Sequence, residues 1–129
     1  MMEIGIIGAA GKMGNALIAT ASPEIFKLHT IVRPTQLEGG APACTFETTP
    51  FEDIDLLIDF SNAASVEKNI EIAVLHKKPL VIGTTGHTES SFTCMELASK
   101  TIPLLYSSNF SIGIFLIKTF ITHHLPFLS

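Results

Sequence analysis

The sequence is poor in cysteine, and this scarcity excludes several kinds of protein. Among its 129 residues only Cys44 and Cys94 are cysteines, and they lie far apart in the chain. A disulfide-stapled domain needs more cysteines, and a zinc site needs them at short, regular spacings. We therefore expect two reduced thiols and no bound metal.

Charge of one sign and long apolar runs are also scarce. The net charge is −4, and no block of like charges occurs, so a nucleic-acid partner is not expected. The most apolar stretch, Ile112 to Ile121, has ten residues and already includes Lys118, whereas a membrane span needs about 20. The chain starts Met-Met-Glu, which places an acid where a secretory signal carries positive charge. We expect no membrane contact and a cytoplasmic location.

The sequence does contain a regular alternation of short apolar runs and amphipathic stretches, in a chain long enough for one domain. The pattern predicts strands at 3–8, 26–32, 55–60, 79–83 and 102–106, helices at 11–21, 65–77 and 88–100, and a further helix from 111 to about 126. Residues 33–50 are rich in proline and glycine and predict a loop, with one short strand near 44–46. Strands that alternate with helices predict a doubly wound α/β fold with a parallel sheet, whose strands are buried on both faces.

A glycine-rich turn follows the first predicted strand and opens the first helix. It reads GAAGKMG from Gly8 to Gly14. Glycine at the first position permits a tight turn, at the second it lets the backbone approach a pyrophosphate, and at the third it lets the helix pack closely. The helix N-terminus then offers its amides to the phosphates. The spacing is GxxGxxG and not the usual GxGxxG, so a glycine turn without a ligand is the alternative. The predicted cofactor-binding residues here are Gly8, Ala9, Ala10, Gly11, Lys12 and Met13.

The end of the second predicted strand bears on the choice of nucleotide. An acid at this point usually holds the adenosine ribose 2′-hydroxyl, but the chain reads Val32-Arg33. Arg33 can pair with a 2′-phosphate, which favours NADPH over NADH. The alternative is that Arg33 is a solvated loop residue.

Small polar turns follow three of the later strands. They are Phe60-Ser61-Asn62, Gly83-Thr84-Thr85-Gly86 and Ser107-Ser108-Asn109-Phe110-Ser111. Ligands of doubly wound sheets lie beyond the carboxyl ends of the strands, so we expect these turns to share one site. From them we predict as cofactor-binding Phe60, Ser61, Gly83, Thr84, Thr85, Ser108, Asn109, Phe110 and Ser111.

Taken in order, the segments GAAGKMG, DFSN, GTTG and SSNFSIG resemble the dihydrodipicolinate (4-hydroxy-tetrahydrodipicolinate) reductase family. The resemblance implies reduction of a cyclic dicarboxylate to tetrahydrodipicolinate by NADPH or NADH, on the route to diaminopimelate and lysine. By resemblance, residues 8–13 cradle the pyrophosphate, Arg33 meets the 2′-phosphate, and residues 83–85 line the nicotinamide side. Residues 108–111 close the pocket at a hinge.

The family also implies parts that this sequence does not contain. Its members continue into a second domain, which supplies a catalytic histidine and lysine, grips the substrate carboxylates and builds a homotetramer. We therefore expect no catalytic residue within residues 1–129. His123-His124 lacks the family's flanking residues, and adjacent histidines on a helix point in different directions. We expect a truncated reductase: an NAD(P)-binding domain at 1–110 and a hinge helix at 111–129, inactive and not tetrameric alone.

Two other functions fit parts of the sequence. A non-catalytic module that binds or senses NADP(H) would need the cofactor site and no second domain. An S-adenosylmethionine-binding domain fits less well, since such sites usually have an acid where this chain has Val32-Arg33. Retention of a specific protein partner would favour the sensing module.

Overall fold

A five-stranded parallel sheet forms the centre of the molecule, for which the computed structural model describes residues 1–31 and 44–124. The strands lie in the order β2-β1-β3-β4-β5. Their bounds are β1 Met2–Ile7, β2 Phe26–Ile31, β3 Leu56–Asp59, β4 Leu80–Ile82 and β5 Leu104–Tyr106. The chain leaves β1 toward one edge and returns to continue toward the other, so the direction of winding reverses between β1 and β3. This confirms the doubly wound α/β fold.

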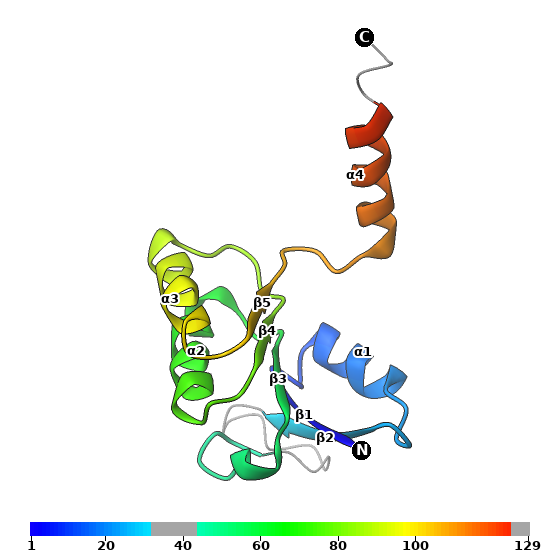
Figure 1. Ribbon diagram of the computed structural model, residues 1–129. Coiled ribbons are helices and arrows are strands. Elements are labelled where there is room, and N and C mark those ends of the chain that lie inside the picture. Colours follow the sequence, from blue (N-terminus) through cyan, green and yellow to red (C-terminus); the bar gives the residue numbers. More distant parts are fainter. Residues whose placement is uncertain (32–43, 125–129) are drawn as a thin grey trace.

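Helices cover both faces of the sheet (Figure 1). Helix α1, Lys12–Thr20, lies on one face, while α2, Val66–Leu75, and α3, Glu89–Ser99, lie together on the other. Two short 3-10 turns, η2 (Phe51–Asp53) and η3 (Ala63–Ser65), precede β3 and α2. Helix α3 begins at a side-chain cap, because the Thr88 hydroxyl accepts the Ser91 amide at 3.3 Å. Apart from the short strand near 44–46, each predicted helix and strand that lies in the described residues is confirmed to within a few residues at its ends.

The larger part of the hydrophobic core lies between the sheet and the α2–α3 layer. Leu57, Ile70 and Ile82 are at its centre and are fully buried. A smaller cluster of Ile4, Ile6 and Ala9 lies under α1. Burial of aliphatic side chains on this scale, at about 25 cal/mol per Å² of apolar surface, is the main force that holds the layers together.

The expectation that all strands are buried on both faces is wrong for the later strands. On the α1 face, Ile58 of β3 and Val81 of β4 are only partly buried, and Leu105 of β5 is 55% exposed. These three residues are neighbours in register, so they form one row across the sheet. Helix α1 is the one helix of residues 1–31 and 44–111 on this face, and it packs over β1 and β2. The row is left without a helix above it.

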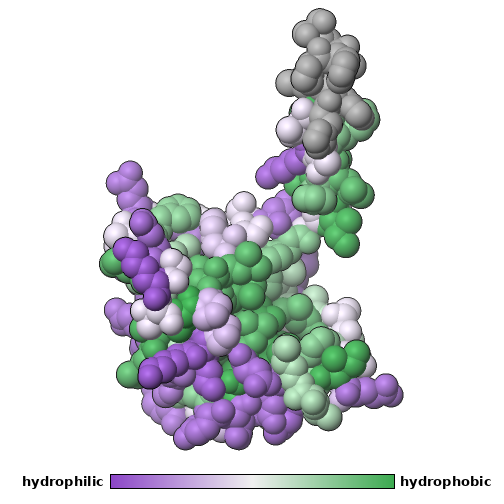
Figure 2. Space-filling model, in the orientation of Figure 1, coloured by the Kyte–Doolittle hydropathy of each residue, from purple (hydrophilic) through white to green (hydrophobic). Residues whose placement is uncertain are grey.

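Helix α4, Ile112–His124, extends away from the rest of the fold (Figure 1). Most of its side chains are apolar, and Ile112, Phe115 and Phe120 are each more than half exposed. Figure 2 shows the resulting hydrophobic surface along α4 and a second hydrophobic area across the middle of the visible face. The predicted helix from residue 111 is confirmed as far as residue 124.

The predicted strand at 44–46 is reduced to a single bridge between Ile31 and Cys44. The chain turns directly afterwards, because the Thr45 amide donates to the Thr48 hydroxyl at 2.9 Å and the Thr49 hydroxyl donates to the Thr45 carbonyl at 2.6 Å. Threonine hydroxyls that bond to their own backbone compete with the strand ladder and end it here. Val32 and Arg33 lie outside the described residues.

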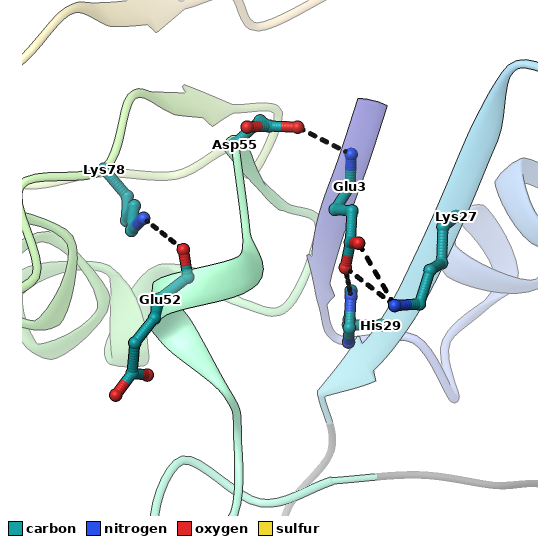
Figure 3. Close-up of polar contacts among 6 residues, drawn as sticks. All are labelled: Glu3, Lys27, His29, Glu52, Asp55 and Lys78. Atoms are coloured by element: carbon teal, nitrogen blue, oxygen red, sulfur yellow. Dashed lines mark hydrogen bonds and ion pairs between the residues drawn. The ribbon is translucent and has the colours of Figure 1, made fainter. Parts of the chain in front are cut away.

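Polar contacts join the strands at their amino ends (Figure 3). The Glu3 carboxylate on β1 pairs with Lys27 at 3.0 Å and with His29 at 2.6 Å, both on β2. The hydrogen bonds from His29 and Lys27 lower the pKa of the Glu3 carboxyl below its ordinary value. Asp55 accepts the Glu3 amide at 2.8 Å just before β3. These contacts link β1, β2 and the segment before β3 at the amino-terminal edge of the sheet.

Within the described part of the chain no helix is long and apolar enough to cross a membrane. The same residues contain no group of three or more histidine, cysteine or acidic side chains that could hold a metal ion. Cys44 and Cys94 are both free thiols. Burial raises the pKa of the Cys94 thiol, and Glu67 adds to the shift.

Candidate functional site

The carboxyl ends of the strands meet at one edge of the sheet, and a turn follows β1, β3, β4 and β5 there. The ladder of backbone hydrogen bonds continues one step into these turns. In each case the first turn residue donates its N–H to the last carbonyl of the neighbouring strand: Gly8 to Ile31, Phe60 to Ile7, Gly83 to Asp59 and Ser107 to Ile82, at 2.9 to 3.1 Å. The sheet itself therefore fixes the starting point of these four predicted site segments.

Gly8 makes the turn that leaves β1. Its φ is +83°, a conformation that side chains disfavour. A Cβ atom at this position would lie 2.7 Å from the Ser61 Cα atom and 2.8 Å from its nitrogen. Two segments that are 53 positions apart thus approach backbone to backbone, at the place where the winding of the sheet reverses. Crevices at this reversal point are where nucleotides bind in doubly wound folds.

The amino end of α1 lies directly after this turn. Its N-cap is Gly11, which has no side-chain hydrogen bond to the first turn of the helix, and the Gly11 amide itself donates to the Gly8 carbonyl at 2.9 Å. Gly14 brings the helix onto the turn, since a Cβ there would lie 2.5 Å from the Gly8 carbonyl oxygen and 2.6 Å from the Ala9 Cα. An uncapped helix start keeps its first amides free for an anion.

A buried carboxylate holds the turn after β3. Asp59 is fully buried, and its Oδ1 atom accepts both the Ser61 amide at 2.8 Å and the Ser61 hydroxyl at 2.6 Å. Its Oδ2 atom accepts the side-chain amide of Asn69, on α2, at 2.8 Å. Three hydrogen bonds compensate for taking the carboxylate out of water. The Ser61 hydroxyl oxygen also accepts the Asn69 side-chain amide at 3.1 Å, so one of its lone pairs remains to accept a donor from a ligand.

These segments surround an open pocket of about 290 Å³. The lining residues come from α1, from the turn after β3 and from the turn after β4, and they are Met13, Phe60, Ser61, Asn62, Ala63, Gly83, Thr84 and Thr85. The Phe60 ring packs against Gly83, where a Cβ atom would collide with it. Phe60 also meets the Phe110 ring edge to face, with the ring centres 6.0 Å apart.

The structure brings together most of the predicted site residues. Met13, Phe60, Ser61, Gly83, Thr84 and Thr85 line the pocket, and residues 8–12 form the adjoining turn and helix start. Ser108, Asn109 and Ser111 are exposed and do not line it. The Ser111 amide donates to the Asn109 side-chain oxygen at 2.7 Å, and only Phe110 of this segment reaches the pocket wall, through Phe60. Arg33 is not described.

Sequence reasoning missed four polar residues at the site: Asp59, Asn62, Asn69 and His87. Asp59 ends an apolar run and so resembles an ordinary turn residue. Asn62 accepts the Ser65 amide at 3.1 Å and caps the turn before α2. His87 bonds back to Thr84. The one available signal was position, because Asp59 lies at the end of a predicted strand, and Asn62 and His87 follow a predicted strand or its glycine turn.

The described residues fit a dinucleotide on geometric grounds. The Gly8–Gly14 turn exposes backbone and free helix amides where side chains could not be accommodated. The pocket beyond it is lined by hydroxyls, a ring and a buried threonine. An anion suits the first part, and a planar polar ring suits the second.

Comparison with known proteins agrees with this geometry. The family model "Dihydrodipicolinate reductase, N-terminus" matches residues 2–110. The 4-hydroxy-tetrahydrodipicolinate reductase of Zymomonas mobilis is 40% identical over 120 residues, which cover 88% of this chain and 44% of that protein. The enzyme of the same name from Helicobacter hepaticus is 36% identical over 119 residues, 88% of this chain and 47% of that protein. The chain therefore spans about half the length of these curated relatives.

A solved structure shares the fold. Dipicolinate-bound dihydrodipicolinate reductase from Paenisporosarcina sp. TG-14 superposes with a TM-score of 0.77 over 96% of this chain and 53% of that one, at 24% sequence identity. A match at this identity supports the arrangement of strands and helices and no residue role.

Proposed function

Because the chain belongs to the dihydrodipicolinate reductase family, we propose that residues 1–110 form a domain that binds a nicotinamide nucleotide, NADPH in preference to NADH. The observation that carries the proposal is the approach of Gly8 to Ser61 beside an uncapped helix start and a pocket. This combination provides a place for the pyrophosphate and, next to it, a place for the nicotinamide ring.

Each part of the site has a task in the proposal. Backbone amides of residues 8–13 hold the pyrophosphate, helped by the positive end of α1. Arg33 pairs with the 2′-phosphate of NADPH. Phe60, Ser61 and residues 83–85 enclose the nicotinamide half, with the Ser61 hydroxyl as an acceptor. Residues 108–111 lead into a hinge, and α4 belongs to it.

The reaction we propose for the whole protein is reduction of 4-hydroxy-tetrahydrodipicolinate to tetrahydrodipicolinate, a step toward diaminopimelate and lysine in the cytoplasm. The nucleotide, when bound, supplies the hydride. The residues of this chain bind and orient it and keep water from one face of its ring. A second domain supplies the proton and grips the carboxylates, and it builds the tetramer. The 129 residues alone therefore bind nucleotide but reduce the substrate poorly or not at all.

The test is a titration of the purified chain with NADPH and with NADH, followed by nucleotide fluorescence. We expect saturable binding, tighter for NADPH by about 10- to 100-fold, as one charge-assisted hydrogen bond contributes about 1.5–3 kcal/mol. Arg33→Ala should remove most of this preference.

Two matched glycine variants separate the site from the rest of the chain. Gly11→Val introduces a side chain near the Gly8 carbonyl, 3.2 Å from the new Cβ, and should abolish binding. Gly113→Val in α4 meets nothing closer than 3.6 Å and should leave binding unchanged. A chain that is folded by circular dichroism and binds neither nucleotide would contradict the proposal.

A further inference from the structure

The loop after β4 contains a histidine whose side chain bonds to the backbone of the site. The His87 Nε2 atom lies 2.8 Å from the Thr84 carbonyl oxygen and 3.0 Å from the Thr84 hydroxyl oxygen. A carbonyl oxygen can only accept, so the shorter contact places the imidazole proton on Nε2. Thr84 is itself buried and lines the pocket.

Local geometry makes this contact possible. Gly86 has a φ of +83°, and this reverses the chain so that His87 comes back over Thr84. In a closed reverse turn, the backbone N–H of the fourth residue would bond to the first carbonyl. In this loop the imidazole of the fourth residue takes that place. The loop conformation therefore depends on one side chain.

The imidazole is held in turn by aromatic neighbours. The His87 ring meets Tyr106 edge to face at 5.4 Å and Phe92 at 5.9 Å between ring centres. Tyr106 and Phe92 also pack on each other at 5.5 Å. Within residues 1–31 and 44–124, the buried His87 Nδ1 atom has no hydrogen-bond partner. A buried polar atom left without a partner is a cost that a purely packing residue would not carry.

The bond to the carbonyl also sets the direction of the next amide. In a trans peptide the C=O and the following N–H point in opposite directions, so the Thr85 N–H points away from His87. Thr85 lines the pocket, and no backbone hydrogen bond in the described parts of the chain uses its N–H. This N–H is a fixed donor at the site.

We propose that His87 is a positioning residue for the nicotinamide half of the cofactor. It holds the Thr84–Thr85 peptide so that the Thr85 N–H donates to a carbonyl oxygen of the ligand, which in NADPH is the carboxamide oxygen. The inference rests on the proposed function, because it assigns a role within the same site. His87 acts through the peptide and does not touch the reacting atoms.

The experiment compares two probes on three forms of the chain. NADPH contains the nicotinamide half, and adenosine 2′,5′-bisphosphate lacks it. His87→Phe keeps a ring between Phe92 and Tyr106 but cannot donate, whereas His87→Gln retains an N–H that can reach the carbonyl. If His87→Phe does not fold, His87→Leu serves the same purpose.

We expect His87→Phe to weaken NADPH binding by about three- to tenfold, the range for loss of one hydrogen bond, and to leave binding of the bisphosphate unchanged. His87→Gln should recover most of the NADPH affinity. Equal weakening of both probes would mean a general structural role and would overturn the inference, as would unchanged NADPH binding. If the unsubstituted chain binds neither probe, the proposed function fails and this inference fails with it.

Discussion

Replacing Gly14 by alanine tests whether the contact between α1 and the glycine turn is as tight as the structure indicates. The added Cβ would lie 2.5 Å from the Gly8 carbonyl oxygen, 2.6 Å from the Ala9 Cα atom and 2.7 Å from the Ala9 carbonyl oxygen. All three are backbone atoms, which cannot rotate away as the end of a side chain can. The helix or the turn must therefore move.

The expected magnitude combines two opposing effects. Overpacking a close contact costs about 1–3 kcal/mol or more, and rigid backbone neighbours place this site at the upper end. Alanine recovers about 1 kcal/mol because it favours the helix over glycine. We expect a net loss of about 2 kcal/mol, and so a melting temperature lower by roughly 8 °C or more for a domain of this size. Nucleotide affinity should fall more than tenfold, because the displaced turn is the proposed phosphate site.

Gly113→Ala is the matched control, since it is also a glycine inside a helix. Its Cβ would meet nothing closer than the Ser111 hydroxyl at 3.6 Å. The helix-propensity gain is the same and no steric cost opposes it, so this variant should be as stable as the unsubstituted chain or up to about 1 kcal/mol more stable, with unchanged nucleotide affinity. Melting followed by circular dichroism and titration with NADPH measure both quantities. The steric reasoning is refuted if Gly14→Ala melts at or above the temperature of the unsubstituted chain.

Two further predictions follow from the polar groups. Asp59→Asn should lower the free energy of unfolding by about 1–2 kcal/mol, because the asparagine side chain cannot accept from both Ser61 and Asn69, and one buried donor loses its partner. Chemical denaturation measures this free energy. An equal or higher stability of the variant would mean that the cost of desolvating the Asp59 charge dominates. Because the pKa of Glu3 is lowered in the folded chain, its ionised carboxylate stabilises the fold. This contribution is present above the pKa of Glu3 in the unfolded chain, near 4.5, and is lost as the pH falls through the lower pKa of the folded chain. Glu3→Gln should therefore be less stable than the unsubstituted chain at pH 7 and equal to it at strongly acid pH; a pH-independent difference between the two melting curves would contradict this.

The order of elements could be predicted from the sequence because each strand is a short apolar run with clear boundaries. Gly8 ends the first run, and Gly83 ends the fourth. The alternation of these strands with helices is then enough to predict a parallel sheet. The strand expected at 44–46 could not be excluded in this way, because Thr45 and Thr49 hydroxyls bond to the backbone and turn the chain. Such local competition is visible only once the side chains are placed.

The half-covered face of the sheet depends on tertiary structure and not on pattern. Ile58, Val81 and Leu105 belong to runs that are as apolar as those of fully buried strands. Whether they are covered depends on the position of a helix above them, and α4 extends away from them. Periodicity tells which residues can be buried, while topology decides which of them are.

The parts of the site that are formed by backbone could be predicted from the sequence, and the parts that are held in place by side-chain hydrogen bonds could not. The close contacts at Gly8 and Gly14 could be predicted from the residue type, because only glycine fits those positions. Asp59 and His87 act through hydrogen bonds that depend on side-chain rotamers, Asp59 with Asn69 on α2 and His87 with Thr84 in its own loop. Their residue types alone are compatible with ordinary turns.

The most direct test of the proposed cofactor site is the map of backbone amide shifts caused by NADPH in an NMR spectrum of the ¹⁵N-labelled chain. We expect the largest shifts at residues 8–14, at Ser61 and at residues 83–85. We expect small shifts at Lys27 and Asp55, at the opposite edge of the sheet. Saturable shifts centred on that opposite edge, or no shifts in a folded chain, would contradict the proposed site.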